Sequence, residues 1–391
     1  MSFTLGLERC SENPPKILER RRFGLLMNQA SVDRDFRYAH DLLGVRCPGQ
    51  LTALFGPQHG MWGEQQDNMV ETQSGRDPRV GVPIHSLYGE YRKPRAEMLE
   101  GLELLVVDLQ DVGTRVYTFV WTLTYCLEAC SAAGVPVLVL DRPNPLGGHT
   151  VEGPLLEEEF TSFVGRAPIP MRHALTIGEL ASYLNESMAI GAELHVHPMV
   201  GWTRSMEWTD TGRSWVPTSP NLPRLEGVSV YPGIVLVEGT QLSEGRGTTT
   251  PFEVVGAPFI DPHALVDRVR DFGDCGVVWR PVRFEPTFQK YAWKSCGGLF
   301  VHSRERSELR SYRAALALLG SVRGLWPEEF EWLQPPYEYE RNLMPIDILS
   351  GSQRVREAID AGLTRDVLDG LCRVDVQDWR RRTAPHRLYP D

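Results

Sequence analysis

Residues 102–140 limit the possible folds more than any other stretch of this chain. Residues 102–109 are mostly apolar and do not alternate, which is typical of a strand buried on both faces of a parallel sheet. Residues 115–133 then repeat apolar side chains at helical spacing and end at Gly134, and another apolar strand follows at residues 136–140. Strand, helix and strand with short joins form a right-handed βαβ unit, so the sequence predicts an α/β fold with a mostly parallel sheet.

The remaining segments differ in character before and after residue 250. Before it, further strands are expected at residues 22–28, 51–55, 193–198 and 234–237, and further helices at residues 31–43 and 176–189. After it, helices at residues 262–272, 307–319 and 352–361 mix with short strands at residues 277–284 and 298–302. Such mixing is typical of an α+β domain. We therefore predict a larger α/β domain over residues 1–250 and a smaller α+β domain over residues 251–391.

A glycine-rich loop after the strand at residues 51–55 brings several polar side chains together. Gly56 and Pro57 stop the strand, and the loop then presents Gln58, His59 and Glu64. Open α/β sheets build ligand sites from such loops, because glycine and proline fix the turn that positions the side chains. The sequence predicts that this loop is one wall of a ligand-binding cleft.

Polar residues also follow the other apolar strands of the first domain. They are Asn28, Gln29, Asp108, Gln110, Asp111, Asp141, Arg142 and Glu238. The carboxyl ends of parallel strands share one edge of a sheet, and ligands bind in the crevice outside that edge. Any one of these residues could simply begin a turn, but together they predict a polar site at the sheet edge.

The charge of the chain narrows the kinds of partner that it can bind. A formal net charge of -10 and a pI of about 5.6 disfavour a nucleic acid or an anionic membrane as a partner. No apolar segment reaches the roughly 18 residues of a membrane span, and acidic residues and prolines interrupt the first residues of the chain. Seven scattered cysteines fit reduced thiols. We therefore expect a cytoplasmic protein, and the sequence carries no signal for its oligomeric state.

Common cofactor and nucleophile motifs are missing from the sequence. The turn after the first strand, residues 28–33, has no glycine, which disfavours a dinucleotide. The sequence also lacks a P-loop, an H-E-x-x-H motif, paired C-x-x-C motifs and a G-x-S-x-G elbow. We therefore predict no cofactor and no metal. Carboxylates, amides, arginines and aromatic rings remain, and these are the groups that glycoside hydrolysis requires.

Ordered motifs along nearly the whole chain resemble one known family. They include FGPQHGMWG, SLYGEYRKP, DLQDVGTRVYT, LDRPNPLGG, PIPMRHALTIGELA, TSPNLP, YPGIVLVEGTQLSEGRGTTTPFEVVGAPFI, FQKYAWKSCGG and PPYEYERNLMPIDILSG. The sequence resembles the exo-lytic β-N-acetylmuramidase (NamZ-like) family. That resemblance implies a Rossmann-like domain with a smaller carboxyl-terminal domain and a cleft between them. It also implies cofactor-independent release of N-acetylmuramic acid from the non-reducing end of peptidoglycan glycan fragments, as in cell-wall recycling.

The sequence departs from the family in the loop after residue 55. The family loop commonly reads G-P-E-H-G, whereas this chain has Gln58, and an amide cannot exchange a proton as a carboxyl group does. We therefore expect the catalytic carboxylate at another position, with His59 as a polar partner. The candidates are Glu64, Asp67, Asp108, Asp111 and Glu238. Two alternatives remain open, a non-catalytic muropeptide- or sugar-binding protein and a small-molecule transferase of α/β fold.

Substrate-binding residues are expected from the same motifs. The candidates are Asn28, Gln58, Gln110, Arg115, Tyr117, Asp141, Arg142, Asn144, Asn221, Tyr231 and Arg246. N-acetylmuramic acid carries a lactyl carboxylate, and arginine recognises a carboxylate through two parallel hydrogen bonds. Arg246 is the first choice for this contact, with Glu244 as a residue that could orient it. For Arg115, an ion pair with Asp111 or Asp108 is an equally good expectation.

Overall fold

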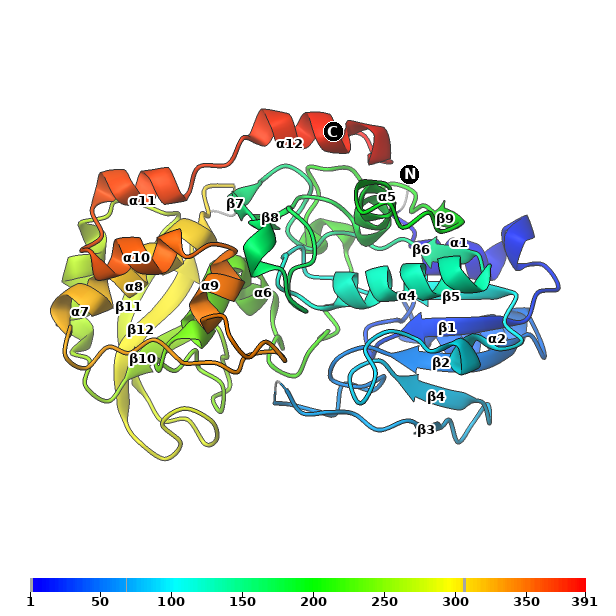
Figure 1. Cartoon of the computed structure of the whole chain (residues 1–391), viewed down its shortest axis with the longest axis horizontal. Coiled ribbons are helices and arrows are strands. Elements are labelled where there is room, and N and C mark those ends of the chain that lie inside the picture. The colour runs from blue at the N-terminus through cyan, green and yellow to red at the C-terminus, as the bar shows by residue number, and fades with distance from the viewer. Residues whose placement is uncertain (1–2, 68, 305–306) are drawn as a thin grey trace.

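A seven-stranded, mostly parallel sheet forms the larger part of the molecule. The computed structural model describes residues 3–67, 69–304 and 307–391. The strands lie in the order β3-β4-β2-β1-β5-β6-β9 (Figure 1). Their bounds are Gly75–Arg76 (β3), Pro83–Ser86 (β4), Leu51–Gly56 (β2), Phe23–Met27 (β1), Leu104–Asp108 (β5), Val137–Leu140 (β6) and Leu194–His197 (β9). All neighbours pair in parallel except β3 and β4. This is the strand order of a Rossmann-like sheet, and the predicted α/β class is confirmed.

Both faces of this sheet are buried, which explains the continuous apolar strands. Along β5, Leu105 and Val107 pack on the side of α4 (Phe119–Ala133), whereas Leu104 and Val106 pack on the opposite side. Side chains alternate along a strand, so a strand covered on both sides needs apolar residues at successive positions. The remaining helices of this part are α1 (Gly6–Glu12), α2 (Ala39–Arg46), α3 (Ala96–Leu99) and α5 (Ile177–Ser187). Strands β7 (Glu152–Leu155) and β8 (Pro170–Arg172) pair as a separate two-stranded antiparallel sheet.

A smaller antiparallel sheet with helices lies at the other end of the molecule (Figure 1). Its order is β10-β12-β11, with bounds Val254–Ala257, Cys296–Ser303 and Val277–Phe284. The helices of this region are α6 (Leu225–Ile234), α7 (Pro262–Arg270), α8 (Ser311–Leu325), α9 (Pro345–Ser350), α10 (Arg354–Asp360) and α11 (Arg365–Leu371). Helices α6 and α8 cross so closely that a Cβ atom on Gly233 would lie 1.8 Å from the Ser311 carbonyl oxygen. Only glycine fits there.

Two expected elements differ in the structure. Residues 234–237, predicted as a strand, are helical: they complete α6 and enter a 3₁₀ helix, Val235–Gly239. In a short apolar run, the spacing of the side chains does not distinguish a buried strand from a buried helix. Residues 234–237 are such a run. The helix expected at residues 31–43 begins only at Ala39. Ser31 and Asp33 instead bond to nearby backbone amides, which competes with helix formation.

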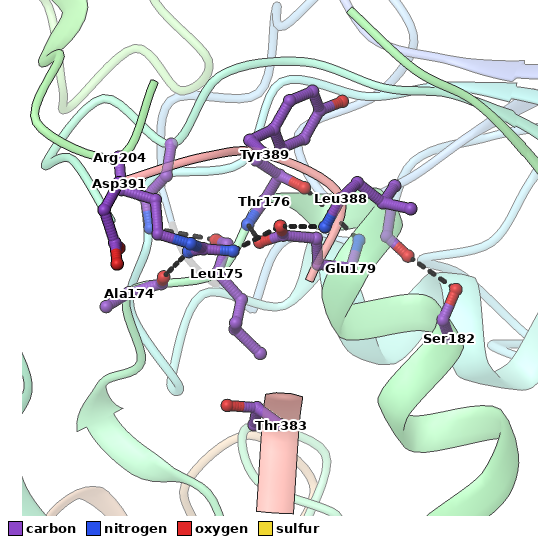
Figure 2. Close-up of polar contacts among 12 residues, drawn as sticks. Ala174, Leu175, Thr176, Glu179, Ser182, Arg204, Thr383, Leu388, Tyr389 and Asp391 are labelled. Carbon is purple, nitrogen blue, oxygen red and sulfur yellow. Dashed lines mark hydrogen bonds and ion pairs between the residues drawn. The ribbon is translucent and has the colours of Figure 1, made fainter. Parts of the chain in front are cut away.

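The carboxyl-terminal segment returns to the large sheet. Helix α12 (Val376–Thr383) runs back across the molecule, and the Trp379 indole donates a hydrogen bond to the His173 carbonyl oxygen at 2.9 Å (Figure 1). Figure 2 shows Glu179 of α5 between Arg204 and the Leu388 backbone amide, which lies 2.8 Å from Glu179 Oε1. The segment is therefore anchored on the region of the large sheet. None of the described helices has the length and apolar character that crossing a bilayer requires.

Candidate active site

A small pocket lies where the parallel sheet meets the carboxyl-terminal region. Its polar lining comprises Gln58, His59, Thr118, Ser219, Glu238, Arg246 and Glu338, and its rings are Tyr117, Tyr231, Phe252 and Tyr337. Its cavity volume is about 40 Å³. Among the described residues, no cluster of three or more His, Cys, Asp and Glu side chains could hold a metal ion.

Glu338 is the carboxyl group of this pocket that retains a proton near neutral pH. Its side chain is buried, with an exposed fraction of 4%. The Tyr88 hydroxyl donates to Oε2 at 2.8 Å, and the Gln58 amide donates to Oε1 at 3.3 Å. Burial raises the pKa of Glu338 to about 7, and the nearby charge of Glu238 adds to that rise. A carboxyl with this pKa can donate a proton in the neutral range.

Gln58 is fixed by Thr118, the residue immediately before α4. The Thr118 hydroxyl donates to Gln58 Oε1 at 2.6 Å. Since that oxygen is occupied, the amide nitrogen of Gln58 points at Glu338. The loop after β2 thus supplies an amide donor to the buried carboxyl.

Glu238 has a different environment from Glu338, because a cation binds it. Arg246 Nη2 donates to Glu238 Oε1 at 2.6 Å, and the Tyr337 hydroxyl donates to Oε2 at 2.6 Å. Arg246 Nε also lies 3.1 Å from Glu244 Oε1, and Lys290 Nζ lies 2.8 Å from Glu244 Oε2. Burial acts to raise the pKa of Glu244, but Lys290 and Arg246 hold it below its ordinary value. Two carboxyls in unlike environments take unlike roles in acid–base chemistry.

His59 is neutral in this site. Burial lowers its pKa to about 4, which the hydrogen bond to the backbone of Gln65 opposes and the charge of Arg246 reinforces. Nδ1 lies 2.7 Å from the Gln65 carbonyl oxygen, so this nitrogen carries the proton and Nε2 is an acceptor. The backbone of His59 has a φ of 72°, a left-handed conformation that is uncommon outside glycine.

The structure places Asp108 and Arg142 away from this pocket. Arg142 donates to both carboxylate oxygens of Asp108, at 2.6 and 2.8 Å, and both side chains are buried. A further Arg142 hydrogen bond reaches the Val32 carbonyl oxygen at 3.1 Å. The pair lies where the strand order reverses between β1 and β5, the crevice in which Rossmann folds bind a dinucleotide. The ion pair lies beside a cavity of about 160 Å³ that Ala30, Val32 and Arg142 help to line.

Most other expected residues at the sheet edge bond within the fold. Asp141 accepts from the Thr176 hydroxyl and the Gly178 amide, both at 2.8 Å, and so caps α5. Arg115 donates to the carbonyl oxygens of Pro154, Ile169 and Leu349 rather than pairing with Asp111 or Asp108. Asn28, Gln110, Asp111, Asn144 and Asn221 each bond to local or neighbouring backbone atoms. Asp67 accepts a hydrogen bond from Gln289.

Replacing Glu64 tests whether its loop supplies the reactive carboxylate. Glu64 is exposed and lines a separate hollow with Trp62 and Arg76. We expect Glu64→Gln to change kcat/KM on a muramyl–glucosaminyl disaccharide by less than about twofold, since surface substitutions away from a site have small effects. Steady-state kinetics would measure this, with Glu97→Gln, another exposed acid, as the control. A loss of a hundredfold or more would make Glu64 the catalytic acid.

Sequence reasoning missed Glu338, Tyr337 and Thr118. Glu338 lies in the motif PPYEYERNL, but it does not directly follow a strand, whereas the predicted acids lie at strand ends or in the glycine-rich loop. One feature of the sequence could have indicated Glu338: it is an acid between two tyrosines in a motif that resembles the family. Of the expected residues, the structure brings Gln58, His59, Tyr117, Tyr231, Glu238 and Arg246 together.

The fold and the pocket define an α/β protein with two buried carboxyls between a parallel sheet and a smaller domain. The chain belongs to the exo-β-N-acetylmuramidase NamZ family, because the N-terminal family model matches residues 23–226 and the C-terminal model residues 229–389. The peptidoglycan β-N-acetylmuramidase NamZ of Bacillus subtilis (strain 168) is 39% identical over 384 residues, 98% of this chain and 91% of that protein.

Solved structures of this fold are known. Two crystal structures of DUF1343 family proteins from Bacteroides fragilis NCTC 9343 match the chain. The first has a TM-score of 0.89 at 31% identity and covers 99% of both chains. The second has a TM-score of 0.78 at 27% identity and covers 100% of both.

Proposed function

We propose that the protein is a glycoside hydrolase that releases N-acetylmuramic acid from the non-reducing end of peptidoglycan-derived glycans. The observation that carries this proposal is the pair of buried carboxyls in one pocket, Glu338 with neutral donors and Glu238 with an arginine. Glycoside hydrolysis uses such a pair, one acid for the leaving oxygen and one carboxylate for the sugar. The similarity to B. subtilis NamZ supports the same reaction.

In this reaction Glu338 is the general acid. It protonates the glycosidic oxygen as the bond to the anomeric carbon breaks, while Gln58 and Tyr88 hold its carboxyl group in place. Water then forms the new bond to the anomeric carbon and releases a proton, which replaces the one that the acid gave up. Glu238, which accepts a hydrogen bond from Arg246, stabilises the positive charge that develops on the sugar. His59 accepts a hydrogen bond from substrate through Nε2.

The two alternative functions have less support. The Gln58 amide donates a hydrogen bond to the Glu338 carboxyl group. The site therefore still contains an acid although position 58 is an amide, which argues against a protein that only binds sugar. The turn after the first strand, residues 28–33, has no glycine that would let the backbone approach a pyrophosphate, which argues against a nucleotide-using transferase.

Turnover of a chromogenic N-acetylmuramide tests the proposed function. We expect release of the chromophore and, from a muramyl–glucosaminyl disaccharide, release of free N-acetylmuramic acid. Binding without turnover between about pH 5 and pH 8 would favour the binding protein. In a thermal-shift comparison, stabilisation by nucleotides alone would favour the transferase.

Arg246 is proposed to contact the lactyl carboxylate as well as Glu238. Its Nη1 atom is buried and has no hydrogen-bond partner among the described residues, so one donor remains for the substrate. We expect Arg246→Ala to lower kcat/KM on N-acetylmuramides about 10- to 100-fold more than on N-acetylglucosaminides, because a hydrogen bond to a charged group is lost. Parallel kinetics on both glycosides measure the ratio. Arg224→Ala, which breaks an ion pair with Glu253 outside the pocket, is the control. An equal loss on both substrates would refute the carboxylate contact.

A further inference from the structure

An aromatic cluster adjoins the Glu338 carboxyl. The Tyr88 ring, whose hydroxyl bonds to Glu338, lies 5.8 Å from both Phe163 and Tyr339, measured between ring centroids. The Tyr339 side chain is 38% exposed. Glu338 and Tyr339 both have positive φ values, 43° and 71°, a strained backbone that is concentrated at functional sites. The strained turn thus places a buried acid next to an exposed ring.

Arg92 covers this cluster with an unpaired charge. Its Cζ atom lies 3.1 Å from the centroid of the Tyr339 ring and 5.9 Å from that of Phe163. No hydrogen bond or ion pair joins Arg92 to another described residue, and its Nε is buried without a partner. Two other stacked arginines differ: Arg95, over Tyr91, pairs with Glu97, and Arg166, over Tyr125, pairs with Glu128. The charge of Arg92 is therefore available to an anion from outside.

Resting on the proposed function, we propose that Arg92 and Tyr339 form the binding surface for the leaving part of the glycan, with Arg92 pairing to a carboxylate on it. A general acid lies beside the oxygen that it protonates, so the leaving part extends from Glu338 past the neighbouring residues, Tyr339 and Arg92. Planar guanidinium and aromatic ring together suit a sugar that carries a carboxylate. In a muramyl glycan that carboxylate is the lactyl group of the next muramoyl unit or the end of its stem peptide.

Arg92→Gln tests this surface when it is measured on three substrates. They are a chromogenic N-acetylmuramide, a muramyl–glucosaminyl disaccharide, and the tetrasaccharide whose leaving part carries a second muramoyl unit. We expect KM to rise about five- to tenfold on the tetrasaccharide and to change less than about twofold on the others, because only the tetrasaccharide presents a carboxylate to Arg92. Added salt should reduce the difference between wild type and variant. Arg92→Lys should recover part of it.

The matched control is Arg95→Gln, an arginine stacked on tyrosine in the same segment that already has an acidic partner. It should leave all three KM values unchanged. A tetrasaccharide bearing a stem peptide distinguishes the sources, because the peptide is joined to the lactyl carboxyl as a neutral amide. A retained Arg92 dependence assigns the contact to the peptide carboxylate, and a lost dependence assigns the contact on the unsubstituted glycan to the lactyl group.

Three results would overturn the inference. One is an Arg92→Gln variant whose KM on the tetrasaccharide equals that of wild type, and another is an equal rise on all three substrates. Both leave the proposed function standing, because the chromogenic N-acetylmuramide is still hydrolysed. Failure of the wild-type protein to hydrolyse any of the three substrates would instead reject the proposed function and this surface together.

Discussion

Glu338→Gln is expected to lower kcat/KM on a muramyl–glucosaminyl disaccharide by about 10²- to 10⁴-fold, the usual contribution of a general acid. The amide keeps the size of the side chain and can still accept from Tyr88, so the fold should be retained. The loss should be smaller on an aryl N-acetylmuramide, because a good leaving group needs less protonation. Steady-state kinetics on the two substrates measure both losses, and circular dichroism checks the fold.

The pH dependence gives a second measure of the same residue. Burial raises the pKa of Glu338 to about 7, so the protonated, active form predominates below that pH and is lost as the pH rises through it. Wild-type kcat/KM should therefore fall on the alkaline side, and the variant should lack this decline. Glu340→Gln is the control, since that acid bonds to adjacent backbone amides outside the pocket. A Glu338→Gln variant of normal activity would assign the proton to another group.

Asp108→Asn is expected to destabilise the folded protein by about 3–5 kcal/mol and to change kcat of the folded enzyme little. The substitution leaves the buried guanidinium of Arg142 without a countercharge, and breaking one side of a buried ion pair has a cost of this size. Urea unfolding at unchanged m-value measures the loss. Asp108 lies outside the pocket that holds Glu338 and Glu238, which is the reason for the unaffected kcat.

The control for this stability measurement is Asp271→Asn, which removes one side of an exposed ion pair with Arg268. We expect its free energy of unfolding to change by less than about 0.5 kcal/mol, because water screens exposed pairs. If Asp108→Asn kept full stability but lost kcat, Asp108 would belong to the chemistry and the proposed assignment of acids would be wrong.

The role of Gln58, where the sequence departs from the family, follows from the residues that surround it in space. In the sequence it is an amide where the family commonly has a glutamate, which raised the expectation of a carboxylate elsewhere. In the structure Thr118 orients that amide, and its nitrogen faces Glu338, which is 280 residues further along the chain. The amide then serves as a donor to the acid rather than as the acid.

The sequence by itself determined five strands of the parallel sheet, β1, β2, β5, β6 and β9, and also the family and the loop that carries Gln58 and His59. A strand buried on both faces needs a continuous apolar run, as β5 has, and the turn after β2 needs Gly56 and Pro57. These features can be predicted because each depends on a few residues that are adjacent in the sequence. Only the tertiary structure decided which carboxyls share a pocket. Asp108 ends a strand yet is paired with Arg142, whereas Glu338 does not directly follow a strand and lies beside Gln58. The protonation of a buried acid depends on burial and on neighbours distant in sequence, and no local pattern contains that information.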